Sequence, residues 1–318
     1  MASTPAGAAT PRQRSVSPAL AGVVSLAAFA AVSLLPLLGV FVGLLASLPL
    51  LQLAASGRSS LLGWGWVTVA LVGAALLLQA PWLSAVALGY LLVAAWPAVA
   101  VELWVRRAWS TGRWSAAVAL LVWGAVSVAM VAAFHPQPPA EGLRAMLAPS
   151  IVEGGEVARA MGALGASVDV LGAALDLTAY VAPAIVACYV LTAALWVRPR
   201  LPLLGLPRGE EPFAAYRSEE WLPVAFALGG LGWVFAGGVA KWLATNLFLV
   251  VLCLYFVHGL AIIHFHLGRR FGSNRWVRLA VALFALQMPV AVALAALGLV
   301  DNFFSLRRGG SSDGGSEA

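Results

Sequence analysis

His258 is the residue of this sequence best placed to do chemistry inside a membrane, because it lies in a long apolar run. Tyr255 lies one turn before it and Gly259 follows it directly, so a helix would place all three on one broad face. Asn246 lies on the other face of the same segment. Ionisable groups in hydrocarbon are costly and are functional candidates by default. Two interpretations stay open: these four residues bind a ligand, or His258 is a neutral histidine hydrogen-bonded to a neighbouring helix.

Other familiar chemical signatures are missing from the sequence. It contains no GxxxxGK[ST] or HExxH motif, which would mark phosphate-binding or zinc-protease sites. His264 and His266 are two residues apart and fall on opposite sides of a helix, so they cannot share a metal. Cys188 and Cys253 lie singly in apolar runs, without a CxxC pair. We therefore expect no catalytic residues, no metal and no cofactor, and a protein that is not an enzyme.

The composition excludes a soluble protein. Of the 318 residues, 62% are hydrophobic and 10% are charged, whereas soluble domains average about 25% charged residues. The formal charge is +6, and Lys241 is the only lysine. The basic residues lie in short loops between apolar runs, whereas a nucleic-acid-binding protein carries a basic patch on a polar domain. The expected partner is the lipid bilayer.

Hydropathy predicts an all-α, polytopic transmembrane helix bundle. A spanning helix needs about 20 apolar residues, and about nine runs qualify, with eight to nine spans expected because the first two are tight for two helices. The runs cover 19–36, 37–55, 61–79, 81–101, 115–134, 177–197, 221–240, 242–267 and 277–300. They form a single membrane domain over 19–308, flanked by polar or small-residue tails at 1–18 and 309–318 that are predicted to be disordered.

One long loop, 135–176, is predicted to lie outside and to contain an amphipathic helix. Ser150 and Glu153 have capping-box spacing, which predicts a helix start. An apolar stripe at three- and four-residue intervals follows, made of Val157, Met161, Leu164, Val168, Leu171 and Leu175. The helix either covers the bundle or membrane surface, or forms a lid over a cavity.

Arginine clusters predict the orientation. They occur near residues 12, 58, 106, 198 and 269, each separated from the next by two spans. Cationic loops stay in the cytoplasm, so the N-terminus is predicted to be cytoplasmic and the protein to lie in the inner (plasma) membrane. Arg307 and Arg308 do not fit, since nine spans would put them outside. Either the last helix does not cross fully, or the basic pair is a local exception.

Small residues mark a second kind of candidate site. Gly39, Gly43 and Ser47 line one face of the predicted second span. Such spacing lets helices approach closely. This face serves either internal packing or the docking of another membrane protein.

The C-terminal third carries a set of short motifs. Phe213, Tyr216 and Arg217 precede Trp221-Leu-Pro, and the chain closes with Leu297-Gly-Leu-Val-Asp301 and Arg307. Over about 210–308 this pattern resembles the YybS-like family of uncharacterised bacterial polytopic membrane proteins. The general look of that family is similar to the S components of energy-coupling-factor vitamin transporters and to the cell-shape protein MreD. The resemblance brings no catalytic residues with it.

These observations predict a transport-related inner-membrane protein, resembling an S component that binds a small-molecule solute and needs a partner for energy. One alternative is a cell-envelope or division scaffold that binds other membrane proteins. A weaker alternative is a lipid-handling membrane enzyme. Convergent carboxylates or histidines at the membrane boundary would favour the enzyme, and a buried polar cavity would favour the solute binder.

Overall fold

A computed structural model describes residues 17–34, 42–56, 58–79, 82–107, 109–151, 168–204, 212–272, 274–285, 287–304 and 306–307. Throughout these residues the regular structure is helical, with no strand. The chain forms two compact units. Unit 1 comprises 1–106 and 193–208, and unit 2 comprises 107–192 and 209–318. Each is described separately below.

Unit 1 is built from short apolar helices around a small buried core. Its helices are α1 (Pro18–Leu34), α3 (Leu48–Ala55), α4 (Leu61–Leu77), α5 (Trp82–Tyr90), the π-helical turn η1 (Leu91–Ala95) and α6 (Trp96–Arg107). Tyr90 is buried in the core and donates a 3.1 Å hydrogen bond to the Ser25 hydroxyl, which donates to the Ala46 carbonyl at 2.7 Å. Glu102 accepts hydrogen bonds from the hydroxyl and backbone N–H of Ser60 at the start of α4.

Unit 2 begins with the long helix α7 (Thr111–Phe134). The Ser110 hydroxyl caps its N-terminus by accepting a 3.2 Å hydrogen bond from the Arg113 N–H, as N-cap serines do. After α7 the chain forms α8 (Pro139–Ile151) and α10 (Val168–Tyr180), which pack against each other and carry an exposed Arg144–Asp176 ion pair. Helix α11 (Ala182–Val197) follows and continues into the 3-10 helix η2 (Arg198–Leu204) of unit 1.

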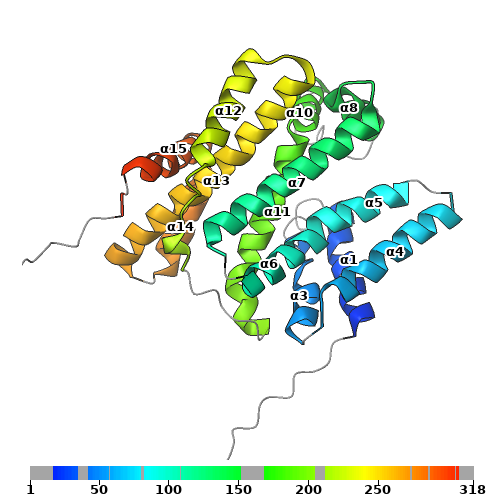
Figure 1. Cartoon of the computed structure of the whole chain (residues 1–318), viewed down its shortest axis with the longest axis horizontal. Coiled ribbons are helices and arrows are strands. Elements are labelled where there is room, and N and C mark those ends of the chain that lie inside the picture. Colours follow the sequence, from blue (N-terminus) through cyan, green and yellow to red (C-terminus); the bar gives the residue numbers. More distant parts are fainter. Residues whose placement is uncertain are drawn as a thin grey trace, which may run out of the picture. The chain divides into compact units, whose positions relative to one another are not determined.

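The rest of unit 2 is organised around α13. The 3-10 turn η3 (Phe213–Ala215) leads through an extended stretch to α12 (Leu222–Phe235), which packs along α13 (Gly238–Phe271), as Figure 1 shows. Helix α13 has 34 residues and ends with Arg269 and Arg270, whose charges favour a helix C-terminus. Gly272 then adopts a positive φ of 59°, which glycine tolerates at no steric cost. The chain continues with α14 (Arg275–Ala285) and α15 (Met288–Phe304).

Four helical segments are long and apolar enough to cross a membrane: Val86–Trp104, Thr111–Phe134, Ala182–Leu203 and Gly238–Phe271. Four shorter apolar helices accompany them, namely α1, α4, α12 and α15. The all-helical, multi-pass architecture predicted from hydropathy is therefore confirmed. The count of nine spans stays a prediction.

Three predicted spans differ from the helices observed. In the 37–55 run, residues 44–47 form a turn and α3 has only eight residues. The 177–197 run is broken at Val181, next to Pro183, and the 277–300 run is broken at Gln287, next to Pro289. Proline lacks a backbone N–H and favours the first turn of a helix, so a new helix starts at each break although hydropathy stays high.

The predicted outer helix is also partly corrected. Ser150 does not cap a helix start, because it lies within the last turn of α8. The later part of the predicted stripe is present, since Leu171 and Leu175 are buried on α10 and Ala179 continues the same face. Val168 begins α10 but its side chain, like Glu153, Val157, Met161 and Leu164, lies outside what the structure describes. In the described part of the segment, α8 and α10 form a helical pair.

Candidate functional site

The candidate site forms where α15 crosses α13, at two facing glycines. A Cβ atom on Gly259 would overlap the carbonyl oxygen of Leu294, and one on Gly298 would overlap the carbonyl oxygen of Tyr255. The two backbones can therefore approach this closely only because neither position carries a side chain. The crossing brings the polar residues at the end of α15 onto the middle of α13.

A continuous chain of side-chain hydrogen bonds starts at this crossing. The His258 Nε2 lies 2.9 Å from Oδ2 of Asp301, and its Nδ1 lies 2.9 Å from the Ser218 hydroxyl. The Ser218 hydroxyl is also 2.7 Å from Oδ1 of Asn302, whose Nδ2 is 3.3 Å from the Tyr255 hydroxyl. His258 and Asp301 are almost fully buried, with side chains 1% and 2% exposed. We call this chain, together with Arg307, the polar relay.

Arg307 closes the polar relay at its acidic end. Its guanidinium donates to the carbonyl oxygens of Ala214 at 2.7 Å and Tyr216 at 2.6 Å. The same group lies 3.5 Å from Oδ2 of Asp301, and Oδ1 of Asp301 accepts a 2.6 Å hydrogen bond from the N–H of Leu306. Asp301 is thus paired with a buried cation and hydrogen-bonded, which is what a buried carboxylate requires.

The loop carrying Ser218 is fixed between α7 and α13. A Cβ on Gly112, in the first turn of α7, would overlap the carbonyl oxygen of Arg217. The Tyr216 ring packs edge-on against His258, and its hydroxyl is buried beside Ser115 of α7. Burial raises the pKa of Tyr216 above its ordinary value, because desolvation disfavours the phenolate. These contacts hold Ser218 in place beside Nδ1 of His258.

The polar relay lies near one membrane boundary and not at the middle of a span. Ser218, which touches His258, belongs to a loop with exposed Arg217 and Glu220. Charged, exposed side chains are excluded from hydrocarbon. Counted from Lys241 near the other end of α13, a hydrocarbon core takes about 20 residues, which ends close to His258. His258 is therefore at the edge of the apolar layer, where water and a buried ionic pair can meet.

The facing atoms define one donor pattern in the polar relay. The Ser218 hydroxyl donates to Oδ1 of Asn302, and Nδ2 of Asn302 donates to the Tyr255 hydroxyl. Because an amide oxygen only accepts, the Ser218 oxygen is left to accept from Nδ1–H of His258. With both ring nitrogens protonated, His258 also donates from Nε2–H to Asp301. A neutral His258 leaves one of these two contacts without a proton, so the relay differs by one hydrogen bond between its two protonation states.

The residues predicted as ligand-binding all have protein contacts in the structure. His258 and Tyr255 belong to the polar relay, and Gly259 is part of the helix crossing. Asn246 is fully buried elsewhere on α13, where Oδ1 accepts from the Ala184 N–H at 3.1 Å and Nδ2 donates to the carbonyls of Tyr180 and Trp242. Asn246 thus replaces backbone hydrogen bonds lost at the α10–α11 break. Only His258, Tyr255 and Gly259 are brought together.

The small-residue face of the predicted second span is only partly described. Gly39 lies outside the described residues, while Gly43 and Ser47 are buried within unit 1. The buried Ser47 hydroxyl has no hydrogen-bond partner among the described residues. These two positions are occupied by internal packing.

Sequence reasoning missed Ser218, Asp301 and Asn302 as members of the site. Asp301 could have been found, since it is an acidic residue at the end of an apolar run, followed by the exceptional Arg307. Ser218 carries no comparable signal, because its role depends on the path of a loop. Among the described residues no group of three His, Cys, Asp or Glu side chains could hold a metal ion, and Cys188 and Cys253 are both free.

Comparison with protein families identifies the family of the chain. Residues 23–302 match the family model described as predicted membrane protein (DUF2232). The chain belongs to this family. The matched range includes His258, Asp301 and Asn302, and ends before Arg307. No curated protein and no solved structure matches the chain.

Membership of DUF2232 confirms the expectation of an uncharacterised, multi-pass membrane protein family. The more specific resemblance to YybS-like proteins, and through them to energy-coupling-factor S components and MreD, stays a prediction. Inner-membrane location and a cytoplasmic N-terminus stay predictions as well.

Proposed function

We propose that this DUF2232 protein is a transport-related component of the inner membrane, which binds a small solute and takes its energy from a partner protein. The observation that carries the proposal is the polar relay itself. Buried histidine–carboxylate pairs in membrane proteins are typical of proton and ion pathways in transporters. The relay differs by one hydrogen bond between the protonated and the neutral state of His258, and it joins α13, α15 and the loop 212–220.

The contacts of the relay favour a role in coupling over direct binding of the solute. Each of its side chains is already bonded to another part of unit 2, so a solute would have to displace protein contacts. A solute bound elsewhere in the helices can instead shift the relay between its two protonation states, and a partner touching the loop can sense the change. In this proposal the protein carries out no covalent chemistry.

Purification from native membranes tests the proposal. The protein is isolated in mild detergent, its co-purifying proteins are identified by mass spectrometry, and pools of polar metabolites are screened for an increase in Tm. We expect a coupling ATPase to co-purify or a solute to raise Tm, and Asp301→Asn to reduce the solute-dependent increase. Division or cell-shape proteins in place of an ATPase, with no solute effect, would support the scaffold alternative and contradict transport.

One observation favours the lipid-handling enzyme as a second candidate. Ser218, His258 and Asp301 are linked in the order hydroxyl, imidazole, carboxylate, at 2.9 Å each, which is how a serine nucleophile is activated. The site lies at the membrane boundary, where an ester of a lipid could reach Ser218. Here Nδ1 faces the serine and Nε2 faces the carboxylate.

An activity-based probe separates the two candidates. If Ser218 is a nucleophile, a fluorophosphonate probe should label the purified protein, and labelling should disappear in Ser218→Ala and fall strongly in His258→Ala. Ser110→Ala, at the exposed cap of α7, is the matched control. An unlabelled wild-type protein, or labelling that persists in Ser218→Ala, would eliminate the enzyme candidate and leave transport.

A further inference from the structure

Helix α14 is apolar on two faces, of which unit 2 covers only one. Ala285 is buried and Val277 and Val281 are partly buried, at four-residue intervals on one face. The other face exposes Trp276, Ala280, Leu283 and Phe284, with Trp276 70% and Leu283 61% exposed. These four residues recur at i, i+4, i+7 and i+8, which is the spacing of a single helix stripe. An exposed apolar stripe of this kind requires a nonpolar environment.

Helix α14 is too short to span the hydrocarbon. Its 11 residues extend about 16 Å, roughly half of the ~30 Å apolar core. The stripe begins with a tryptophan, which prefers the headgroup level. Arg269 and Arg270, at the adjoining end of α13, are exposed. The combination of an apolar face, an indole and flanking cations is typical of helices lying in the membrane surface.

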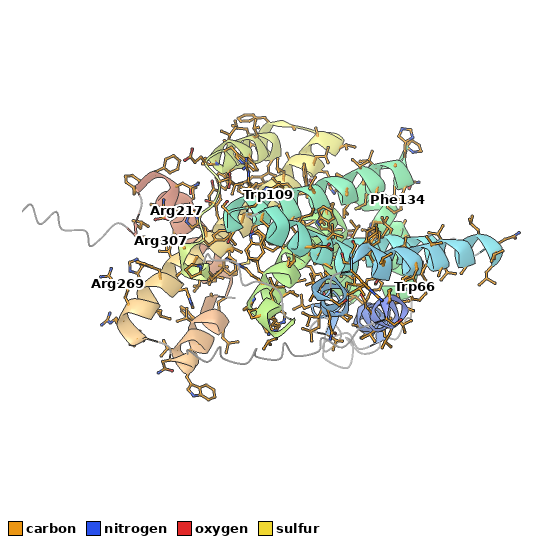
Figure 2. All side chains as sticks on the ribbon, turned by 60° about the horizontal axis from the view of Figure 1, so that its bottom comes forward. Trp66, Trp109, Phe134, Arg217, Arg269 and Arg307 are labelled. Carbon is orange, nitrogen blue, oxygen red and sulfur yellow. The ribbon has the colours of Figure 1, made fainter. Side chains whose placement is uncertain are left out.

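The C-terminal part of α13 and the residues after α15 both contact the loop 212–220. Before the segment α14–α15, His264 of α13, seven residues before the end of that helix at Phe271, packs edge-on against Phe213 of this loop, with ring centroids 5.7 Å apart. Where it ends, Arg307 donates to the carbonyls of Ala214 and Tyr216 in the same loop. Figure 2 shows Arg217 and Arg307 near each other, at the opposite end of α7 from Phe134. A segment that leaves and returns to one loop makes no net crossing.

We propose that α14 lies flat in the headgroup region of an anionic phospholipid leaflet, and that the segment 275–304 does not cross the membrane. Arg307 is then on the same side of the membrane as Arg217. With nine spans it would lie on the opposite side from the other arginine clusters. The charge complementarity of Arg269 and Arg270 with acidic lipid supplies the anionic preference. This inference does not depend on the proposed function.

Spin-label depth measurements on the reconstituted full-length protein test the helix placement. Single cysteines replace Trp276 and Phe284 in a background with Cys188→Ala and Cys253→Ala. The two positions are about 12 Å apart along the helix axis, so a flat helix gives equal depths near the headgroups, whereas a crossing helix gives depths that differ by about that distance. Equal and shallow depths support the proposal, and a depth difference of that size overturns it.

Lipid composition tests the anionic preference. Depths are compared in phosphatidylcholine bilayers with and without phosphatidylglycerol. We expect the labels at 276 and 284 to be more deeply embedded when phosphatidylglycerol is present, and the effect to weaken in Arg269→Gln/Arg270→Gln. The same depth in both bilayers would overturn the anionic preference.

Cysteine accessibility tests the sidedness. Ala215→Cys, Leu306→Cys and Gln137→Cys are treated with an impermeant maleimide in sealed, uniformly oriented vesicles. We expect 215 and 306 to react from one side and 137 from the other, because α7 separates Gln137 from the loop. Labelling of Leu306→Cys from the same side as Gln137→Cys overturns the proposal. If Leu306→Cys fails to fold, a biotin-acceptor peptide after Ala318 reports the side of the C-terminus, with the same two outcomes.

Discussion

The polar relay concentrates charged side chains in the buried interior of unit 2. Asp301 and His258 are nearly inaccessible, and Arg307, with a side chain 7% exposed, supplies the compensating cation. Removing one member of such a group leaves the others unpaired, which costs much more than the intact group contributes. The stability of unit 2 should therefore depend on Arg307 more than on any arginine in an exposed loop.

Arg307→Ala should reduce the free energy of unfolding of unit 2 by about 3 kcal/mol, because Asp301 loses its cation and two loop carbonyls lose their donor. Thermal unfolding in detergent, followed by the loss of the monomer peak in size-exclusion chromatography, measures the change. Arg217→Ala is the control, since this side chain is exposed. Equal decreases in Tm for the two variants would show that Arg307 has no special structural role.

The amino-acid sequence led to His258, Tyr255 and Gly259 because polar and small residues on one helix face can be recognised from their spacing. Their contacts could not be predicted in the same way. Asp301 is 43 residues and Ser218 is 40 residues away from His258, and only the crossing of α15 and the path of the loop bring them together. The open choice between ligand binding and a structural hydrogen bond at His258 depended on these distant residues.

At the scale of elements, α13 connects most of unit 2. Helix α12 packs along its first half, and α15 crosses its second half. Gly259 and Gly298 allow the close approach of α13 and α15. Gly229 has a similar role between α12 and α13, where a Cβ would lie about 3.0 Å from the backbone of Phe248. Close backbone approach is the main way in which helices gain packing energy in lipid.

Gly259→Ala should push α15 away from α13 and separate Asp301 from His258. We expect a clear loss of stability, of about 1–3 kcal/mol, as in other overpacked cores, and a loss of any proton- or solute-linked response. Tm in detergent measures the first effect. Gly268→Ala, on the same helix with no neighbour within 4 Å of its Cβ, should leave Tm nearly unchanged. A tolerated Gly259→Ala would contradict the close crossing.

Element boundaries show what hydropathy can predict. The runs at 61–79, 115–134, 221–240 and 242–267 correspond to α4, α7, α12 and α13 within a few residues, since each run is bounded by charged or extended segments. The breaks at Val181 and Gln287 were missed because the sequence stays apolar through them. Pro183 and Pro289 were the available signals, and they outweigh hydropathy because they remove a backbone donor.

At the scale of the whole molecule, the two ends of the helices of unit 2 differ in their content of arginine. The first turn of α7, the loop 212–220 and Arg307 lie together, as the Gly112–Arg217 and Arg307–Tyr216 contacts show. The opposite end of α7 leads to the exposed Gln137 and to α8, whose only arginine is paired with Asp176. The excess of arginine at one end is the pattern that the positive-inside rule associates with the cytoplasm.

We predict that the arginine-rich end of unit 2 is cytoplasmic. In intact cells that express the protein without its native cysteines, Gln137→Cys should react with a membrane-impermeant maleimide, and Ala215→Cys should react only after the cells are permeabilised. Both positions are exposed, so a difference between them reports the side of the membrane and not burial. The opposite pattern would reverse the orientation of the whole chain while leaving the sidedness of Arg307 relative to Arg217 intact. Because the argument rests on where the arginines gather, Arg113→Glu combined with Arg217→Glu should increase the fraction of inverted molecules, measured as labelling of Ala215→Cys in unpermeabilised cells.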